Sequence, residues 1–156
     1  MLHEFNLITG NRTVSSTSLI PWLLMKQHEI PFHELRIDLF RDDAIEKLGW
    51  FSPSLKVPVL IHHNIKVWDA LPICEYLSET FLEGRGWPLH QQKRASARSV
   101  SAELHGDFQA FKQQWPMNCH LKQASRIDVA ICGTTDQLSA VALSRGEPCK
   151  FLNIGT

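Results

Sequence analysis

The feature that most constrains the fold is a short apolar run that leads into a polar loop and then into a helix. Residues 5–8 are Phe-Asn-Leu-Ile, and Thr9 and Gly10 end the run, as expected for a short buried strand. Residues 11–18 are mostly polar, and a mainly apolar stretch then continues to about His28. Pro21 falls in the first turn of the expected helix, where its missing N–H costs little. The sequence therefore predicts a strand, a polar loop and a helix, in that order.

Residues 15–18, Ser-Ser-Thr-Ser, lie where this helix begins. Their side-chain oxygens are suited to accept hydrogen bonds from the first backbone N–H groups, which have no partner within the helix. The same N–H groups, with the positive end of the helix dipole, are suited to binding an anion. Capping alone is enough to explain an isolated serine cluster, so a ligand site depends on what lies further along the chain.

Composition excludes several classes of protein. The chain has 156 residues, 44% of them hydrophobic, which is enough for one sizeable core or two small ones. Its 16 basic and 16 acidic side chains balance, so no basic surplus indicates nucleic acid. The first residues show no leader pattern, and no apolar run approaches the roughly 18 residues of a membrane span. We expect a cytoplasmic protein with neither nucleic acid nor membrane as partner.

The cysteines are widely spaced, with no Cys-x-x-Cys pair and no histidine pair at ligand spacing. This pattern favours neither a disulfide framework nor a zinc site. We therefore expect no metal and four reduced thiols, at Cys74, Cys119, Cys132 and Cys149.

Further strands and helices follow along the chain. Residues 32–39 alternate apolar and polar side chains, which predicts a second strand. The helix before it supplies the crossover of a right-handed βαβ unit, so the first two strands are expected to pair in parallel. Residues 41–48 predict a short helix, with Gly49 past its end.

A hairpin and a third helix come next. Residues 52–61 and 65–69 contain two short apolar strands joined by a tight turn. Pro58 fits the edge of a sheet or a special turn, and a cis Val57–Pro58 bond is expected. As a plain edge-strand proline it would carry no function. Asp69 fits the N-cap of a helix over residues 69–81, whose apolar side chains have helical spacing.

Three motifs in this order resemble the serine-type glutathione S-transferases, including the zeta class. They are the Ser-Ser-x-Ser run followed by Pro-Trp-Leu-Leu, the Val57-Pro58 pair, and residues 68–77 at the third helix. This last segment is similar to the third-helix sequence of the family. The resemblance implies an α/β thioredoxin-like N-terminal domain (βαβ-α-ββ-α) over residues 1–83. A linker over residues 84–88 and an incomplete all-α C-terminal domain over residues 89–156 would follow.

The resemblance also implies the site. Glutathione would bind as co-substrate, and Ser15 would be the catalytic residue that polarises its thiol. The expected glutathione-binding residues are Ser16, Thr17, Ser18, Lys56, Val57, Pro58, Asp69 and Ala70. In the family an acid-Ser pair holds the γ-glutamyl end, and here the serine is replaced by Ala70. Loss of a hydroxyl hydrogen bond of about 1 kcal/mol predicts severalfold weaker binding.

The second half of the sequence departs from the family. One long helix is expected over residues 89–115, with an apolar stripe that favours self-association as a homodimer. The stripe consists of Val100, Leu104, Phe108, Phe111 and Trp115. His105 and Gln109 have a cleft position as one alternative, but solvent exposure is more common for such a histidine. Too few residues remain for the helical bundle of the family, and residues 121–156 are atypical, with one helix expected near residues 137–143.

The function implied is that of a glutathione transferase acting on a small electrophile, by conjugation or by zeta-like cis–trans isomerisation. A disulfide exchange reaction is disfavoured, because Ser-x-x-Ser stands where redox relatives of this fold carry Cys-x-x-Cys. Two alternatives stay open: a non-catalytic module that binds glutathione or a protein, and an inactive truncated copy. Ala70 and the short second domain favour both alternatives.

Overall fold

The computed structural model describes residues 5–108, 112–113 and 116–120 of the chain. By their contacts these residues fall in two compact units. The first unit contains the described residues up to Asp107 together with residues 117–120, and it holds every element discussed below. The second unit contains the remaining described residues, which are Phe108, residues 112–113 and Pro116.

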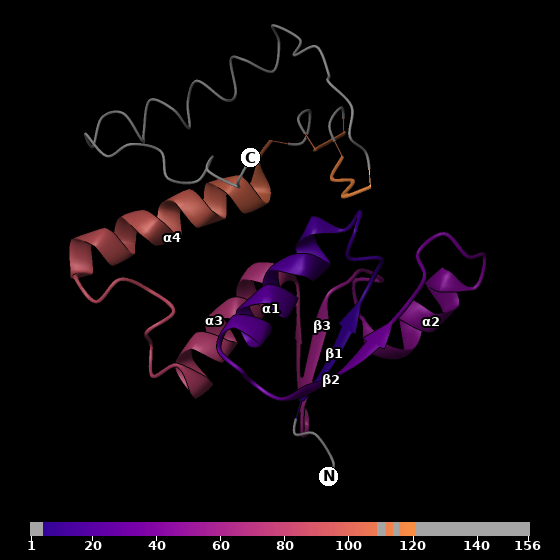
Figure 1. The fold of residues 1–156 in the computed structure, drawn as a ribbon, viewed down its shortest axis with the longest axis horizontal. Coiled ribbons are helices and arrows are strands. Elements are labelled where there is room, and N and C mark those ends of the chain that lie inside the picture. The colour runs from indigo at the N-terminus through magenta and orange to yellow at the C-terminus, as the bar shows by residue number, and fades with distance from the viewer. Residues whose placement is uncertain (1–4, 109–111, 114–115, 121–156) are drawn as a thin grey trace, which may run out of the picture. The chain divides into compact units, whose positions relative to one another are not determined.

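A four-stranded mixed sheet forms the centre of the first unit, with strand order β2-β1-β3-β4 (Figure 1). β1 (Phe5–Thr9) pairs in parallel with β2 (Phe32–Arg36), as the βαβ prediction requires. β3 (Val59–His62) runs antiparallel to β1, and β4 (Ile65–Trp68) completes the hairpin. The predicted cis Val57–Pro58 bond is confirmed.

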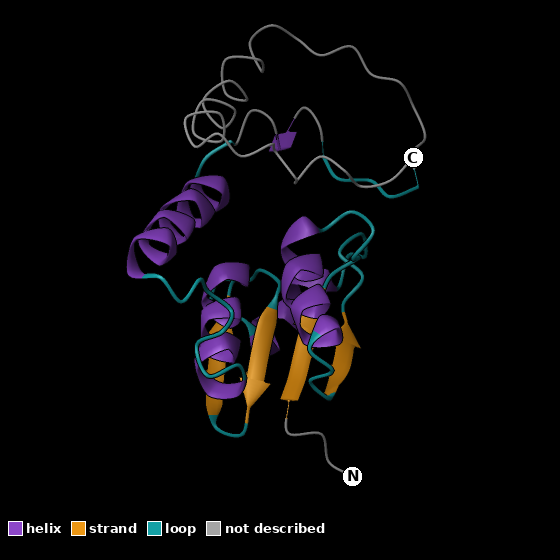
Figure 2. Cartoon of the chain, turned by 60° about the vertical axis from the view of Figure 1, so that its left-hand side comes forward, coloured by secondary structure: helices purple, strands orange, loops and turns teal. Residues whose placement is uncertain are grey.

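Helices cover both faces of this sheet (Figures 1 and 2). α1 (Ser16–Gln27) and α3 (Ala70–Phe81) lie against one face, and α2 (Ala44–Phe51) lies against the other. Because side chains alternate along a strand, neighbouring residues of β1 face opposite cores. Leu7 packs in the cluster with α1 and α3, whereas Ile8 packs in the cluster with α2. This is the thioredoxin-like βαβ-α-ββ-α order expected from the sequence.

Two predicted boundaries are wrong, for local reasons. β2 ends at Arg36 and not near Leu39, because the Leu39 amide donates to the Asn11 side chain, 2.8 Å away, instead of to a strand. α2 begins later than predicted and runs through Gly49 to Phe51. The next strong break is Ser52-Pro53, and a residue before proline disfavours the helical conformation.

The fourth helix, α4 (Gln91–Gly106), is shorter than predicted. It begins near the expected position but ends at Gly106, and Asp107 is extended, with φ −99° and ψ −162°. Glycine disfavours a helix interior, so it marks a natural end. The predicted stripe is therefore not continuous on one helix: Val100 and Leu104 lie on α4, and Phe108 follows its end at φ 60°. Phe111, Trp115, Gln109 and residues 121–156 lie outside the described residues.

Among the described helices, none is long and apolar enough to cross a membrane.

Truncating Leu7 should destabilise the first unit strongly, because its side chain is fully buried in the central strand. We expect Leu7→Ala to lower the free energy of unfolding by about 2–5 kcal/mol. Leu23 on α1 is 48% exposed, so Leu23→Ala is a matched control with a change of about 1 kcal/mol or less. Denaturant unfolding of both variants tests the assignment, and equal losses would contradict the described core.

Candidate functional site

Ser15 caps α1 at the carboxyl end of the central strand. Its backbone is extended, with φ −105° and ψ 94°, and its Oγ accepts from the Ser18 amide at 3.4 Å. The amides of Ser16 and Thr17 have no acceptor among the described residues, as expected in the first turn of a helix. The helix therefore begins with two available N–H donors beside a partly exposed hydroxyl, an arrangement suited to an anionic atom.

The hydroxyl groups at this helix start bond to one another. Ser15 Oγ donates to Ser18 Oγ at 3.1 Å and lies 3.3 Å from Thr17 Oγ1. Ser18 is fully buried, and its Oγ accepts from the Gly10 amide at 3.0 Å. Because a hydroxyl hydrogen rotates about its C–O bond, Ser15 is able to turn its hydrogen away from Ser18. The hydrogen of Ser15 would then be available to a ligand at the helix start.

Gly10 brings the loop close to its neighbours. A Cβ at this position would lie 2.5 Å from Leu39 Cδ1 and 3.1 Å from Val57 Cγ2, both too short for ordinary contacts. A larger residue would push the loop away from residue 57, so glycine allows the loop and the cis-proline segment to approach each other.

Hydrogen bonds link the three sequence motifs into one surface. Thr17 Oγ1 donates to the Val57 carbonyl at 3.5 Å, a long contact at the outer limit of a hydrogen bond. On the other side of the cis bond, the Pro58 carbonyl accepts from the Asp69 amide at 3.1 Å. Residues 11–18, called the serine loop below, thus lie next to the Val57–Pro58 pair and the start of α3.

Asp69 caps α3 in an unusual backbone conformation, with φ 77° and ψ 150°. Its Oδ1 accepts from the Ala70 amide at 2.7 Å, and its Oδ2 lies 3.0 Å from His105 Nε2. Ala70 is almost fully buried, and its amide is already used by Asp69. The ligand-facing group that this corner offers is therefore the Asp69 carboxylate, which is 47% exposed.

A carboxylate on β2 anchors the first turn of the serine loop. Glu34 Oε1 accepts from Thr9 Oγ1 at 2.7 Å and forms an ion pair with Arg12 Nε at 3.0 Å. Glu34 Oε2 accepts from Trp22 Nε1 at 3.2 Å, and the Arg12 guanidinium stacks on the Trp22 ring at 4.2 Å. These contacts join β1, β2, the loop and α1 through one side chain. None of them was predictable from sequence spacing.

Asn11 anchors the same loop to the end of β2. Its Oδ1 accepts from the Leu39 amide, and its Nδ2 donates to Asp38 Oδ1 at 3.1 Å. Two hydrogen bonds stabilise the Asp38 carboxylate and hold its pKa below the ordinary value. The larger effect comes from the Phe40 amide and the smaller from the Asn11 side chain. The loop is thus fixed from two directions before Ser15 is reached.

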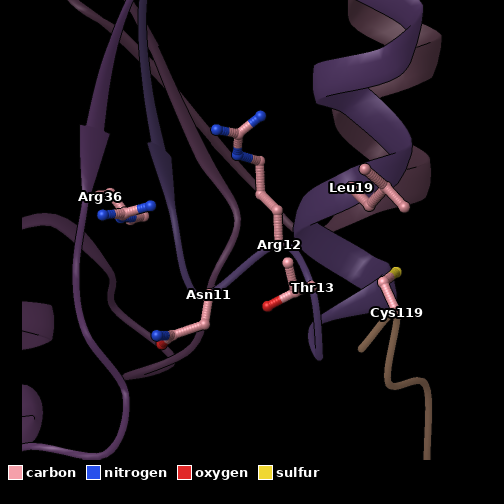
Figure 3. Close-up of a pocket in the computed structure, with 6 residues that line it drawn as sticks. All are labelled: Asn11, Arg12, Thr13, Leu19, Arg36 and Cys119. Carbon is pink, nitrogen blue, oxygen red and sulfur yellow. The ribbon is translucent and has the colours of Figure 1, made fainter. Parts of the chain in front are cut away.

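A hollow of about 290 Å³ lies beside this loop (Figure 3). Arg36 lies on its strand side, Leu19 and Cys119 lie on the α1 side, and Arg12 rises from the loop between them. The Cys119 amide donates to the Thr13 carbonyl at 2.9 Å, which holds residue 119 against the loop. Arg12 is already paired with Glu34, so Arg36 is the guanidinium group that favours an anionic or carboxylate-bearing guest. None of Ser15, Val57 and Asp69 lines this hollow.

The predicted site residues therefore differ in their surroundings. Hydrogen bonds connect Ser15, Thr17, Val57 and Asp69 along one surface, and Ser18 and Pro58 are buried within the same set of bonds. Ser16 and Lys56 are exposed beside it. His105 was expected in solvent, but its side chain is only 31% exposed and contacts Asp69. No sequence signal pairs these two residues, because 36 positions separate them.

Comparison with known proteins agrees with this geometry. Residues 14–80 match the family described as "Glutathione S-transferase, N-terminal domain". A Caenorhabditis elegans protein named "Probable maleylacetoacetate isomerase" is 35% identical over 65 residues, which cover 42% of this chain and 30% of that protein. Over residues 14–80 this chain is therefore similar to the N-terminal domain of glutathione S-transferases.

Solved glutathione S-transferases share the fold. A transferase homologue from Burkholderia GL BGR1, solved with bound glutathione, is 24% identical at a TM-score of 0.60, over 70% of this chain and 58% of that one. A diazinon-metabolizing transferase from the silkworm Bombyx mori is 14% identical at a TM-score of 0.71, over 94% of this chain and 68% of that one. The chain thus spans less than a third of its curated relative and just over half of the Burkholderia protein.

The two free thiols among the described residues, Cys74 and Cys119, should differ in reactivity. Burial, with a smaller contribution from the Glu75 charge, raises the pKa of the Cys74 thiol to about 11, whereas Cys119 is exposed. The reactive species is the thiolate, so at pH 8 the partly buried Cys74 thiol stays protonated. Iodoacetamide labelling with peptide mapping should show Cys119 reacting about tenfold faster or more, since one pKa unit changes the thiolate fraction tenfold.

Denatured chain is the control for this labelling, because unfolding exposes both thiols and should bring their rates together. Equal rates in the native protein would contradict the raised pKa of Cys74.

Proposed function

We propose that this chain binds glutathione on the surface formed by the serine loop, Val57–Pro58 and Asp69, and activates its thiol for attack on a small electrophile. The reaction would be a conjugation or a zeta-like cis–trans isomerisation. The observation that carries the proposal is the bonded series from Ser15 through Thr17 and Val57 to Pro58 and Asp69. It joins in space the three motifs that the sequence spreads over more than fifty positions.

Each part of this surface suits one part of glutathione. The exposed Asp69 carboxylate is suited to the α-ammonium group of the γ-glutamyl end. Val57, in an extended segment before the cis proline, is suited to pair with the cysteinyl backbone as an added strand would. The positive N-terminal end of α1 is then suited to the cysteinyl sulfur of glutathione. The glutathione bound in the Burkholderia homologue supports the same ligand here.

The chemistry required of the protein is stabilisation of negative charge. Glutathione supplies the thiol, which reacts as the thiolate and is mostly protonated at neutral pH. Ser15 would donate its hydroxyl hydrogen toward the sulfur, and the free amides of Ser16 and Thr17 would add the positive end of α1. Ser18, held by the Gly10 amide, would keep the Ser15 oxygen in place.

A second candidate is a module that binds glutathione or a protein without catalysis. Two observations favour it: Ala70 lacks the hydroxyl of the family's acid-Ser pair, and the chain spans only 58% of the Burkholderia transferase. Conjugation of glutathione to a chlorodinitrobenzene, measured by absorbance, separates the two candidates. Binding without conjugation would favour the module.

We also propose a cytoplasmic homodimer. Leu104 on α4 is 52% exposed, and apolar side chains exposed in this way favour association. The balance of 16 basic and 16 acidic residues gives no net charge that would oppose contact between two copies.

Removing the Ser15 hydroxyl should impair turnover more than binding. A hydrogen bond to a charged group is worth about 1.5–3 kcal/mol, so Ser15→Ala should lower kcat/KM by roughly tenfold or more. It should also raise the pKa of the bound thiol, measured by thiolate absorbance against pH. Ser15→Cys should weaken transfer and introduce disulfide exchange with glutathione.

Ser16→Ala is the matched control, because Ser16 is exposed and makes no capping bond in this structure. Ser15→Ala also removes the N-cap, so the free energy of unfolding is measured in parallel and should fall by about 1 kcal/mol. Equal small pKa shifts in both variants would reduce Ser15 to a structural cap.

Restoring the family's hydroxyl should tighten glutathione binding. Ala70→Ser adds a donor for the γ-glutamyl carboxylate next to Asp69, and a hydrogen bond of about 1 kcal/mol corresponds to a severalfold lower Kd. Calorimetric titration of both proteins with glutathione tests this. An unchanged Kd would count against the assigned corner.

A further inference from the structure

The contact between Asp69 and His105 joins two parts of the chain that the family match does not connect. Asp69 lies within the matched residues 14–80, whereas His105 lies in the last turn of α4. His105 Nε2 is 3.0 Å from Asp69 Oδ2, and both side chains are partly shielded, with 31% and 47% exposed. The candidate γ-glutamyl corner thus includes a side chain from outside the matched domain.

A second contact of the same kind fixes α4 on α3. Arg98 Nε lies 3.1 Å from Glu75 Oε1, and Trp87 Nε1 donates to Glu75 Oε2 at 2.6 Å. Arg98 and His105 are seven positions apart, so they lie on the same face of α4 two turns from each other. Their partners are six positions apart on α3 and its N-cap, in the reverse order. The two helices are therefore held antiparallel, and this pairing positions His105 next to Asp69.

The chemistry of the pair sets the hydrogen positions. A carboxylate only accepts hydrogen bonds, so Nε2 of His105 must carry a proton to bond Asp69 Oδ2. The other oxygen, Oδ1, already accepts from the Ala70 amide at 2.7 Å. With one donor on each oxygen the carboxylate plane is fixed. Each oxygen still has a lone pair for a ligand, since a carboxylate offers about four acceptor positions.

We propose that His105 is a positioning residue for glutathione, whose Nε2–H holds the Asp69 carboxylate facing the α-ammonium group of the γ-glutamyl end. This inference rests on the proposed function, because it assumes that glutathione binds at Asp69. Ala70 brings no hydroxyl to this corner, so recognition there depends more heavily on the orientation of Asp69. α4 would thereby contribute to glutathione binding through a residue that need not touch the ligand.

The test compares two ligands in calorimetric titrations of the full chain. Glutathione carries the free ammonium group, and N-acetylglutathione does not. His105→Ala should weaken glutathione binding about threefold to tenfold, on the scale of one hydrogen bond to a charged group, and leave N-acetylglutathione unchanged. His105→Gln should restore most of the loss, because its amide offers an N–H donor. His90→Ala is the matched control, since His90 is exposed at the opposite end of α4 and should change neither ligand.

The outcomes separate the two proposals. If the parent chain binds neither ligand, the proposed function fails and this inference fails with it. If the parent binds glutathione but His105→Ala weakens both ligands equally, His105 only stabilises α4 and the positioning role is overturned. Tighter glutathione binding by His105→Ala would also overturn it, since His105 would then compete with the ammonium group.

A ligand-free measurement checks the contact itself. Nitrogen-15 spectra of the His105 ring should show the proton on Nε2 in the parent, and Asp69→Asn should shift that signal. An Nε2 without a proton, or no shift in Asp69→Asn, would overturn the inference whatever the titrations give.

Discussion

β1 is buried on both faces, and its position determines where the serine loop lies. Leu7 faces the core under α1 and α3, and Ile8 faces the core under α2, so a shift of one residue would turn each side chain toward the opposite core and disrupt the packing of both. With the register of β1 fixed against β2 and β3, the chain must leave the sheet at Thr9 and Gly10. The first turn of α1 therefore begins at a defined edge, next to the end of β2 and the start of β3.

Polar contacts convert this placement into a rigid loop. Glu34 joins Thr9, Arg12 and Trp22, and Asn11 joins the loop to residues 38 and 39 of the turn after β2. Side chains that are held at both ends lose their conformational freedom on folding and not on ligand binding, which lowers the cost of binding. Ser15 is thus presented by a scaffold whose polar groups are largely paired, while its own hydroxyl stays partly exposed.

The second half of the site depends on α3 and on what packs against it. Asp69 adopts φ 77°, a backbone conformation that non-glycine residues rarely take, and bonds to Pro58, Ala70 and His105 hold it there. Glu75, two turns further on, binds α4 through Arg98 and the preceding segment through Trp87. A helix outside the matched transferase domain is in this way coupled to the candidate glutathione corner.

The sequence by itself determined the order of elements in residues 5–81, the parallel pairing of β1 with β2, the cis bond before Pro58, the capping of α3 by Asp69 and the capping of α1 by the serine cluster at residues 15–18, within which the structure selects Ser15. These features follow from local chemistry: apolar periodicity, proline geometry and side chains that cap a helix. The tertiary structure decided where β2 and α4 end, how Glu34 and Asn11 anchor the loop, that the Ala70 amide is used by Asp69, and that His105 reaches Asp69. Those contacts join residues far apart in the chain, and their partners are set by packing, which no short sequence pattern encodes.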